Sequence, residues 1–170
     1  EDVATVPSVS DTAWLDSTAD GVRGDRESLL NRVEVTLERV VGSTVEPVAS
    51  ATTGRDGAYA FTGLSAGEYC LSVTLPSGHQ FTVHGSGSAV LPAQGRGGIT
   101  PNFELSENEA LLLDIGATKQ SGRLALSAFE DVNANGGRRD NEPRVRGVTV
   151  NLMYDYNGKS YVVATETTDK

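Results

Sequence analysis

Cysteine is almost absent from this sequence: Cys70 is the only one in 170 residues, so no disulfide can form within the chain. No apolar run approaches the roughly 20 residues that a membrane-spanning helix needs. No signal peptide opens the chain, and we expect this to be the mature part of the protein if it is exported. Basic residues are also scarce, with 14 Lys and Arg against 23 Asp and Glu and a formal net charge of −9. That charge argues against nucleic acid or an anionic membrane as a partner, since both require clustered Lys and Arg. The lack of a long apolar run argues against membrane insertion.

Catalytic groups are missing as well. The sequence offers no activated nucleophile, no plausible Ser/His/Asp triad and no open catalytic metal site. His79 and His84 have no Cys or carboxylate beside them at a metal-ligand spacing, so we expect them on the surface or in turns. We therefore predict that the protein is not an enzyme.

Aromatic residues are few, but glycine is abundant at 19 residues, together with many Thr, Ser and Val. This composition indicates an aliphatic core, short strands and many turns. Apolar residues alternate with polar ones, most clearly at 33–38 and 68–75, and turn signals recur every few residues. The pattern predicts an all-β fold, an Ig-like or prealbumin-like sandwich. The expected strands cover residues 12–15, 33–38, 45–53, 58–61, 68–75, 80–84, 102–105 and 110–115.

Three further expectations follow from the same pattern. Residues 85–100 are Gly- and Ser-rich and are expected to form a long excursion with little structure, after which 102–105 and 110–115 form a final hairpin. Trp14 is expected to anchor the core. Cys70 alternates with Tyr69 and Leu71, so its thiol is predicted to face outward as an inert group, with an intermolecular bridge as the alternative.

One stretch of twelve residues, 16–27 (DSTADGVRGDRE), carries the spacing of a cation-binding loop. Oxygen-bearing side chains occupy its first, third, fifth and twelfth positions, and Gly21 stands sixth, where the loop must turn. A hard cation such as Ca²⁺ needs six to eight oxygen ligands, which this spacing can supply from a single loop. A carbonyl is expected from the seventh position and a water-mediated contact from the tenth. The candidate ligands are Asp16, Thr18, Asp20, Val22, Asp25 and Glu27.

The loop recurs at residues 131–142 (DVNANGGRRDNE), which match the calcium-loop pattern in full. Its candidate ligands are Asp131, Asn133, Asn135, Gly137, Asp140 and Glu142. The offset between the two loops is 115 residues, and at the same offset Trp14 corresponds to Phe129 and Val35 to Val150. The recurrence indicates an internal repeat. We predict a linker at 1–10, a first sandwich repeat at 11–119 and an incomplete second repeat at 120–170, with one Ca²⁺ in each loop.

Two segments, AWLDSTADGVRGDRESLLNRVEVTL at 13–37 and GRDGAYAFTGLSAGEYCLSVTLPSG at 54–78, resemble the B-type repeat of serine–aspartate-repeat surface adhesins of Gram-positive bacteria. That group is related to the collagen-adhesin B-type and prealbumin-like sandwiches. The resemblance implies a small β-sandwich, calcium held in loops, and a role as one bead of a cell-surface stalk. It also implies a secreted, extracellular or cell-wall location.

The leading hypothesis is therefore a calcium-stabilised spacer repeat in an extracellular adhesin or scaffold. Its partners would be calcium and neighbouring repeats of the same chain. One alternative is an adhesive module that binds a host protein or glycan through residues 85–100. Another is a fibre subunit that assembles head to tail by strand complementation, because an incomplete repeat leaves sheet edges unpaired.

Overall fold

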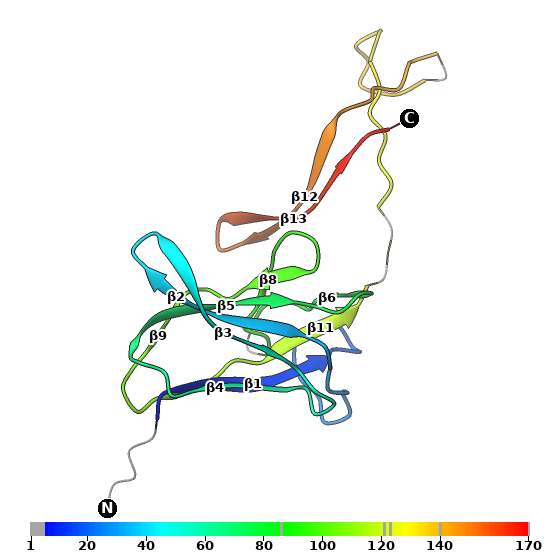
Figure 1. The fold of residues 1–170 in the computed structure, drawn as a ribbon. Helices are drawn as coiled ribbons and strands as arrows, with labels where there is room; N and C mark the ends of the chain where they lie inside the picture. The colour runs from blue at the N-terminus through cyan, green and yellow to red at the C-terminus, as the bar shows by residue number, and fades with distance from the viewer. Residues whose placement is uncertain (1–5, 86, 121, 123, 140, 170) are drawn as a thin grey trace, which may run out of the picture. The chain divides into compact units, whose positions relative to one another are not determined.

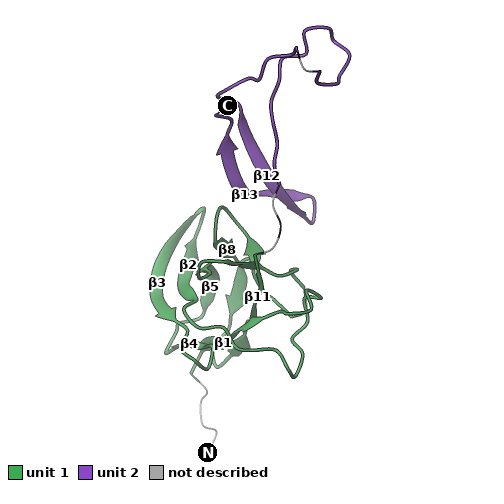
Figure 2. Ribbon diagram, turned by 90° about the vertical axis from the view of Figure 1, so that its right-hand side faces the viewer, with its two compact units in different colours: residues 1–120 green, residues 121–170 purple. Residues whose placement is uncertain are grey.

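The computed structural model describes residues 6–85, 87–120, 122, 124–139 and 141–169. The chain divides into two compact units, residues 1–120 (unit 1) and 121–170 (unit 2), shown in two colours in Figure 2. The regular structure over these described ranges consists of β-strands, and none of it is a helix long and apolar enough to cross a membrane.

Unit 1 contains two β-sheets. In the first, β1 (Ser8–Leu15) pairs in parallel with both β10 (Ala110–Leu112) and β11 (Ile115–Lys119). Strand β4 (Ala58–Thr62) pairs antiparallel with β1, and β6 (His79–Phe81) antiparallel with β11. Figure 1 shows β1 and β4 as the layer below β2, β3 and β5.

The second sheet has the order β3-β2-β5-β8-β7, with β9 also paired to β5. Strand β5 is therefore the centre of this sheet, in antiparallel contact with β2, β8 and β9. Its strands are β2 (Glu34–Val41), β3 (Thr44–Thr52), β5 (Gly67–Thr74), β7 (Leu91–Pro92), β8 (Gly97–Ile99) and β9 (Phe103–Leu105).

The core lies between the two sheets, where both contribute alternate side chains. Val9 and Ile115 come from the first sheet and pack with Val35, Leu37 and Leu71 from the second. Trp14 is fully buried, as predicted, and its indole Nε1 donates a hydrogen bond to the carbonyl of Gly87 at 3.2 Å. Two β-sheets packed around one apolar core confirm the predicted all-β, Ig-like sandwich.

The predicted linker at 1–10 is too long. Strand β1 begins at Ser8, and the Ser8 amide donates to the carbonyl of Glu109 at 2.9 Å. Val9 is a core residue with no exposed surface. The partners of this strand, β4 and β10, flank it in the sheet and lie more than 40 residues away in sequence. The strand therefore shows no alternation of its own that would mark it in the sequence.

The predicted excursion at 85–100 and the final hairpin are also wrong. Residues 97–99 are strand β8, which pairs with β5, and residues 91–92 are strand β7, which pairs with β8. Val90 and Leu91 are buried. Residues 103–105 pair with β5 in one sheet, whereas 110–112 pair with β1 in the other. The chain crosses between the sheets here, so these two strands do not face each other.

Cys70 lies outside the core cluster, on the face of β5 that alternation predicts, but its thiol is fully buried. The Cys70 Sγ donates to the Glu38 carboxylate on β2 at 3.6 Å. Burial, reinforced by the Glu38 charge, raises the pKa of the Cys70 thiol to about 11. The predicted outer face is therefore correct, but the thiol is covered rather than exposed. A covered, protonated thiol is a poor nucleophile, and the inertness of Cys70 stays a prediction.

The described residues of unit 2 form one strand pair, β12 (Thr149–Tyr156) and β13 (Lys159–Thr167). It reproduces β2 and β3 at the offset of 115 residues. Leu152 pairs with Ala164 and Met153 with Val162, with a register shift between them. The equivalent shift in unit 1 lies between Leu37 and Glu38.

Candidate metal centres

The first candidate loop begins at Asp16, at the end of β1, where only 2% of the residue is exposed. Its Oδ1 accepts hydrogen bonds from the amides of Ala19 and Asp20 at 2.6 and 3.3 Å, and its Oδ2 from the amide of Gly21 at 2.8 Å. Ala19 and Gly21 adopt positive φ angles of 58° and 76°, which turn these amides toward one carboxylate. The loop is thus folded around the Asp16 side chain.

Burial alone would raise the pKa of Asp16. The hydrogen bonds from the Thr82 hydroxyl and from the amides of Gly21 and Ala19 outweigh that effect and hold the pKa of this carboxyl below its ordinary value. Asp16 is therefore ionised in the folded protein at neutral pH, as a cation ligand must be.

Glu27 closes the loop at its twelfth position. Its Oε1 accepts from the amide and hydroxyl of Ser17, at 2.7 and 3.2 Å, while Oε2 accepts from the amide of Gly24 at 3.0 Å. The amide of Gly24, followed by those groups of Ser17, holds the pKa of Glu27 below its ordinary value. One carboxylate therefore ties the two ends of the loop together.

The body of unit 1 supports the loop through groups that sequence reasoning missed. The Thr82 hydroxyl donates to Asp16 Oδ2, and the Asp16 amide donates to the carbonyl of Ala117 at 2.7 Å. A side chain at Gly87 would place its Cβ 2.3 Å from the carbonyl oxygen of Gly21, so only glycine lets this segment lie against the loop. Thr82 and Gly87 are each 66 residues from the loop residue they contact, Asp16 and Gly21, and carry no local signal of this contact.

The second candidate loop repeats this conformation at the offset of 115 residues. Asp131 accepts from the amide of Gly136 at 2.8 Å and from that of Asn135 at 3.1 Å. Ala134 and Gly136 have φ angles of 55° and 75°, matching their counterparts in the first loop. The Gly136 amide is also the main cause that lowers the pKa of Asp131.

Two further bonds recur in both loops. One joins the side chain at the fifth position to the amide at the seventh, and the other joins the twelfth side chain to the amide at the ninth. The pairs are Asp20–Val22 at 2.9 Å and Asn135–Gly137 at 2.8 Å, then Glu27–Gly24 at 3.0 Å and Glu142–Arg139 at 2.9 Å.

The loops differ at the closing glutamate. Glu142 is only 3% exposed, and its Oε1 has no hydrogen-bond partner among the residues that the structure describes. Glu27 Oε1, in contrast, accepts from Ser17 and Thr18. A buried carboxylate oxygen without a donor is costly unless a cation or a water offsets it.

The remaining candidate ligands are placed as follows. Thr18 donates its hydroxyl to Asp16 at 3.2 Å, and Asn133 accepts from the amide of Asn135 at 3.1 Å. Asp25 is exposed, and Asp140 lies outside the described residues. In the described ranges, no group of three or more His, Cys, Asp or Glu residues lies close enough to form a metal cluster.

The donors nevertheless fit a hard cation. Every candidate ligand offers oxygen, and an ionised carboxylate has about four lone-pair sites, so accepting amide hydrogen bonds does not exhaust it. The buried oxygen of Glu142 is the clearest vacant acceptor. The first loop is more fully satisfied by its own groups, because both oxygens of Glu27 accept hydrogen bonds.

Comparisons with known proteins find relatives of this chain. Serine-aspartate repeat-containing protein F of Staphylococcus epidermidis is 32% identical over 161 residues, which cover 95% of this chain and 9% of that protein. Serine-aspartate repeat-containing protein D of Staphylococcus aureus (strain Newman) is 32% identical over 157 residues, covering 92% and 11%. The chain thus spans about a tenth of the length of these relatives.

Solved structures with a similar arrangement include a streptococcal ancillary pilin, with a TM-score of 0.45 and 12% identity over 98% of this chain and 48% of that one. The Bacillus anthracis TIE protein matches with a TM-score of 0.43 and 18% identity, over 98% of this chain and 25% of that one. The family model of the SdrD B-like domain matches residues 7–110. This chain belongs to the SdrD B-like domain family.

Proposed function

We propose that this chain is a calcium-stabilised structural repeat that acts as a spacer in an extracellular, cell-surface adhesin. The observation that carries the proposal is the shared loop conformation: two twelve-residue loops, 115 residues apart, fold around the same acidic first position with the same amide hydrogen bonds. The serine–aspartate-repeat relatives support a surface protein of this type.

Each loop would hold one Ca²⁺ through side-chain oxygens and one carbonyl, with the tenth position contributing through water. Bound Ca²⁺ supplies positive charge that offsets the clustered carboxylates and cross-links the ends of the loop. The first set is Asp16, Thr18, Asp20, Val22, Asp25 and Glu27. The second set is Asp131, Asn133, Asn135, Gly137, Asp140 and Glu142.

A static, stiffening ion fits this architecture better than a switch. Both loops connect β-structure. Asp16 directly follows β1, and its amide donates to the carbonyl of Ala117 on β11. An isolated bridge between Phe129 and Arg144 flanks the second loop. Calcium sensors open a pair of helices, and the regular structure over the described residues contains only strands. The ion would therefore fix the loop against the sheet and keep the spacer rigid.

Adhesion through residues 85–100 has less support. Val90 and Leu91 are buried, and residues 97–99 pair with the central strand β5. Aromatic rings, on which sugars commonly stack, are absent from this segment of the sequence. The segment is built into the sandwich rather than presented as a free loop.

Thermal unfolding of the chain with Ca²⁺ and with chelator tests the proposal. At ten times its dissociation constant, each ion would stabilise its unit by about 1.4 kcal/mol, which raises Tm by about 5–10 °C for a domain of this size. Glu142→Gln is expected to remove the Ca²⁺ effect from unit 2 and to cost little in chelator, since Oε1 has no donor to lose. Glu27→Gln is expected to destabilise unit 1 even in chelator, because it weakens hydrogen bonds to Ser17 and Gly24.

Glu104→Gln in β9 is the matched control, because it removes the same charge from an exposed residue of the sandwich. It should keep the full Ca²⁺ effect. A Tm that is equal in Ca²⁺ and chelator, or a rise that Mg²⁺ reproduces at the same concentration, refutes the proposal of a calcium-specific spacer.

A further inference from the structure

The sequence contains two Asn-Gly pairs, Asn135–Gly136 in the second candidate loop and Asn157–Gly158 in the turn between β12 and β13. An asparagine side chain loses its amide group most readily before glycine, because glycine has no Cβ to hinder the approach of its own amide nitrogen to the asparagine Cγ. The folded structure then decides whether that approach is possible. The two pairs have opposite environments and can be compared within one chain.

The pair Asn135–Gly136 is held in place by its loop. The Gly136 amide donates to Asp131 Oδ2 at 2.8 Å, and Asn135 Oδ1 accepts from the amide of Gly137 at 2.8 Å. The nitrogen that must attack and the side chain that must be attacked are both engaged in hydrogen bonds. Since a hydrogen bond to an ionised carboxylate is stronger than one between neutral groups, releasing the Gly136 amide is costly.

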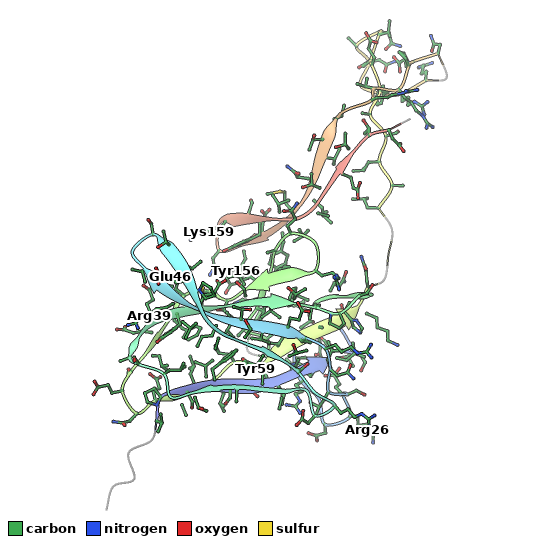
Figure 3. The ribbon with its side chains drawn as sticks, in the orientation of Figure 1. Arg26, Arg39, Glu46, Tyr59, Tyr156 and Lys159 are labelled. Carbon is green, nitrogen blue, oxygen red and sulfur yellow. The ribbon has the colours of Figure 1, made fainter. Side chains whose placement is uncertain are left out.

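The pair Asn157–Gly158 is open. These two residues form the tight turn between Tyr156 and Lys159, which pair with each other across the hairpin and are labelled in Figure 3. Asn157 and Gly158 are both exposed, with φ angles of 48° and 73°. Within the described part of the chain, neither the Asn157 side chain nor the Gly158 amide forms a hydrogen bond. Exposed turns also open locally at little cost in free energy, which lets the backbone reach the geometry of attack.

The exposure of this turn is a property of the repeat itself. Its counterpart in unit 1, at the offset of 115 residues, is the turn Gly42–Ser43, which is exposed although both sheets of that sandwich are present. Gly42 also has a positive φ, of 62°. Unit 1 therefore has the same exposed hairpin end, with a glycine where unit 2 has Asn157.

We propose that Asn157 is a site of spontaneous deamidation and that Asn135 is protected from the same reaction by its loop. The Gly158 amide nitrogen gives its proton to a base in solvent and attacks the Asn157 Cγ. The N–Cγ bond forms and the Cγ–Nδ2 bond breaks. Nδ2 takes up a proton and leaves as ammonia, so that a five-membered succinimide remains.

Water then opens the succinimide ring in one of two ways. Cleavage of the new N–Cγ bond gives aspartate. Cleavage of the bond between the Gly158 nitrogen and the Asn157 carbonyl carbon gives isoaspartate, in which the main chain runs through the side chain. Neither step oxidises or reduces the protein, and water is the only co-reactant that is consumed.

Both products change the end of the hairpin. Each adds one negative charge, and isoaspartate also adds the Cβ carbon to the main chain of a two-residue turn. Because a turn of this length fixes the register of its hairpin, the longer turn disfavours the pairing of Tyr156 with Lys159. The reaction therefore loosens the hairpin of unit 2 with time, whereas the hairpin of unit 1 has no asparagine in its turn.

The test incubates the whole chain in mildly alkaline buffer with chelator, well below its Tm, and follows both asparagines by peptide mass mapping and an isoaspartate assay. We expect Asn157 to lose its amide about tenfold faster than Asn135 or more, because Asn135 reacts only after the bond from Gly136 to Asp131 opens. In guanidinium chloride neither turn is held, and the two rates should agree within about twofold. The chelator keeps the outcome separate from the calcium proposal.

Two variants connect the rates to these contacts. Asn157→Gly copies the glycine of the unit 1 turn and should abolish the reaction at the hairpin while Asn135 behaves as in the parent chain. Asp131→Asn weakens the acceptor of the Gly136 amide and should speed the reaction at Asn135 without changing the rate at Asn157. Two results overturn the inference: equal rates at both asparagines in the folded chain, or no reaction at Asn157 under conditions in which the unfolded chain reacts at both.

Discussion

Asp11 on β1 faces Asp114, and the two carboxyl groups are unequally placed. The Thr12 hydroxyl donates to Asp114 at 3.0 Å, and the Arg23 guanidinium lies 3.9 Å from the same carboxylate. The Asp11 carboxylate accepts a hydrogen bond from the amide of Thr12 at 2.9 Å. Burial, followed by the charge of Asp114, raises the pKa of Asp11 above its ordinary value.

A raised pKa in an acid means that its ionisation opposes folding. This penalty is absent below the unfolded pKa, near 3.8, and grows as the pH rises through the folded pKa. Asp11→Asn imitates the protonated form and keeps an acceptor for the Thr12 amide. We expect it to raise the Tm of unit 1 at pH 7, with the advantage shrinking toward pH 4 in paired melts with chelator.

Glu109→Gln serves as the control for loss of one negative charge, because its Oε2 accepts the exposed amide of Ser106 and lies outside the pair. It should not show the same pH-dependent gain. An Asp11→Asn variant that is less stable than the parent at pH 7 would contradict the interpretation of the pair.

At single positions, the sequence predicted burial and local geometry well. Trp14 was expected in the core and lies there, and Gly21 was expected at the sharp turn and has a φ of 76°. Cys70 was misjudged because alternation tells which face a side chain takes, whereas the neighbouring strand β2 decides whether Glu38 covers it. The partner Thr82 could not be predicted, since only the tertiary fold brings it to Asp16.

At the level of elements, residues 82–85 and 87–88 act as a strut behind the first loop. Thr82 bonds to Asp16, Gly87 lies against Gly21, and the Ser88 hydroxyl accepts the amide of Gly116 on β11 at 3.1 Å. The segment therefore connects the loop to the sheet that β1 and β11 form.

Gly87→Ala tests this strut. The added Cβ would lie 2.3 Å from the Gly21 carbonyl oxygen and 2.9 Å from the Val22 Cα, both of them backbone atoms. The segment must move away, at a cost of roughly 1–3 kcal/mol that urea unfolding can measure. Gly85→Ala is the control, because nothing lies within 4 Å of its added Cβ. Equal stability of the two variants would show that the segment does not press on the loop.

Long alternating strands were predictable and short irregular ones were not. Strands β2 and β5 show clear alternation because one face of each packs on the core. Strands β7 and β8 have two and three residues and include Gly97 and Gly98, so no periodicity marks them. Gly98 is needed there, because an added Cβ would lie 2.5 Å from Phe81 and Val90 atoms. Such packing arises from contacts between distant segments.

At the scale of the whole molecule, the two units share the same local hydrogen bonds but differ in how deeply these bonds are buried. The Thr53 hydroxyl donates to Leu30 at 2.8 Å, and the Thr168 hydroxyl donates to Val145 at 2.9 Å. Yet Thr53 is buried in unit 1, whereas Thr168 is only partly buried in unit 2. Local sequence builds the loop and strand pair in each unit, and the second sheet is what buries them.

The net charge of −9 means that carboxylates repel one another across the chain, and the calcium proposal implies that bound Ca²⁺ relieves part of this repulsion. In chelator, raising NaCl from about 0.05 to about 0.3 M shortens the screening length to below about 10 Å, which weakens the repulsion among carboxylates. Tm should therefore rise with salt.

With a fixed excess of Ca²⁺, the increase in Tm caused by Ca²⁺ should shrink as NaCl rises, because the same salt weakens the attraction between the ion and its ligands. Sucrose at matched osmolality is the control, since screening requires ions. A Tm that falls with salt in chelator, or a Ca²⁺ increment that grows with salt, would show that charge repulsion is not what the ions relieve.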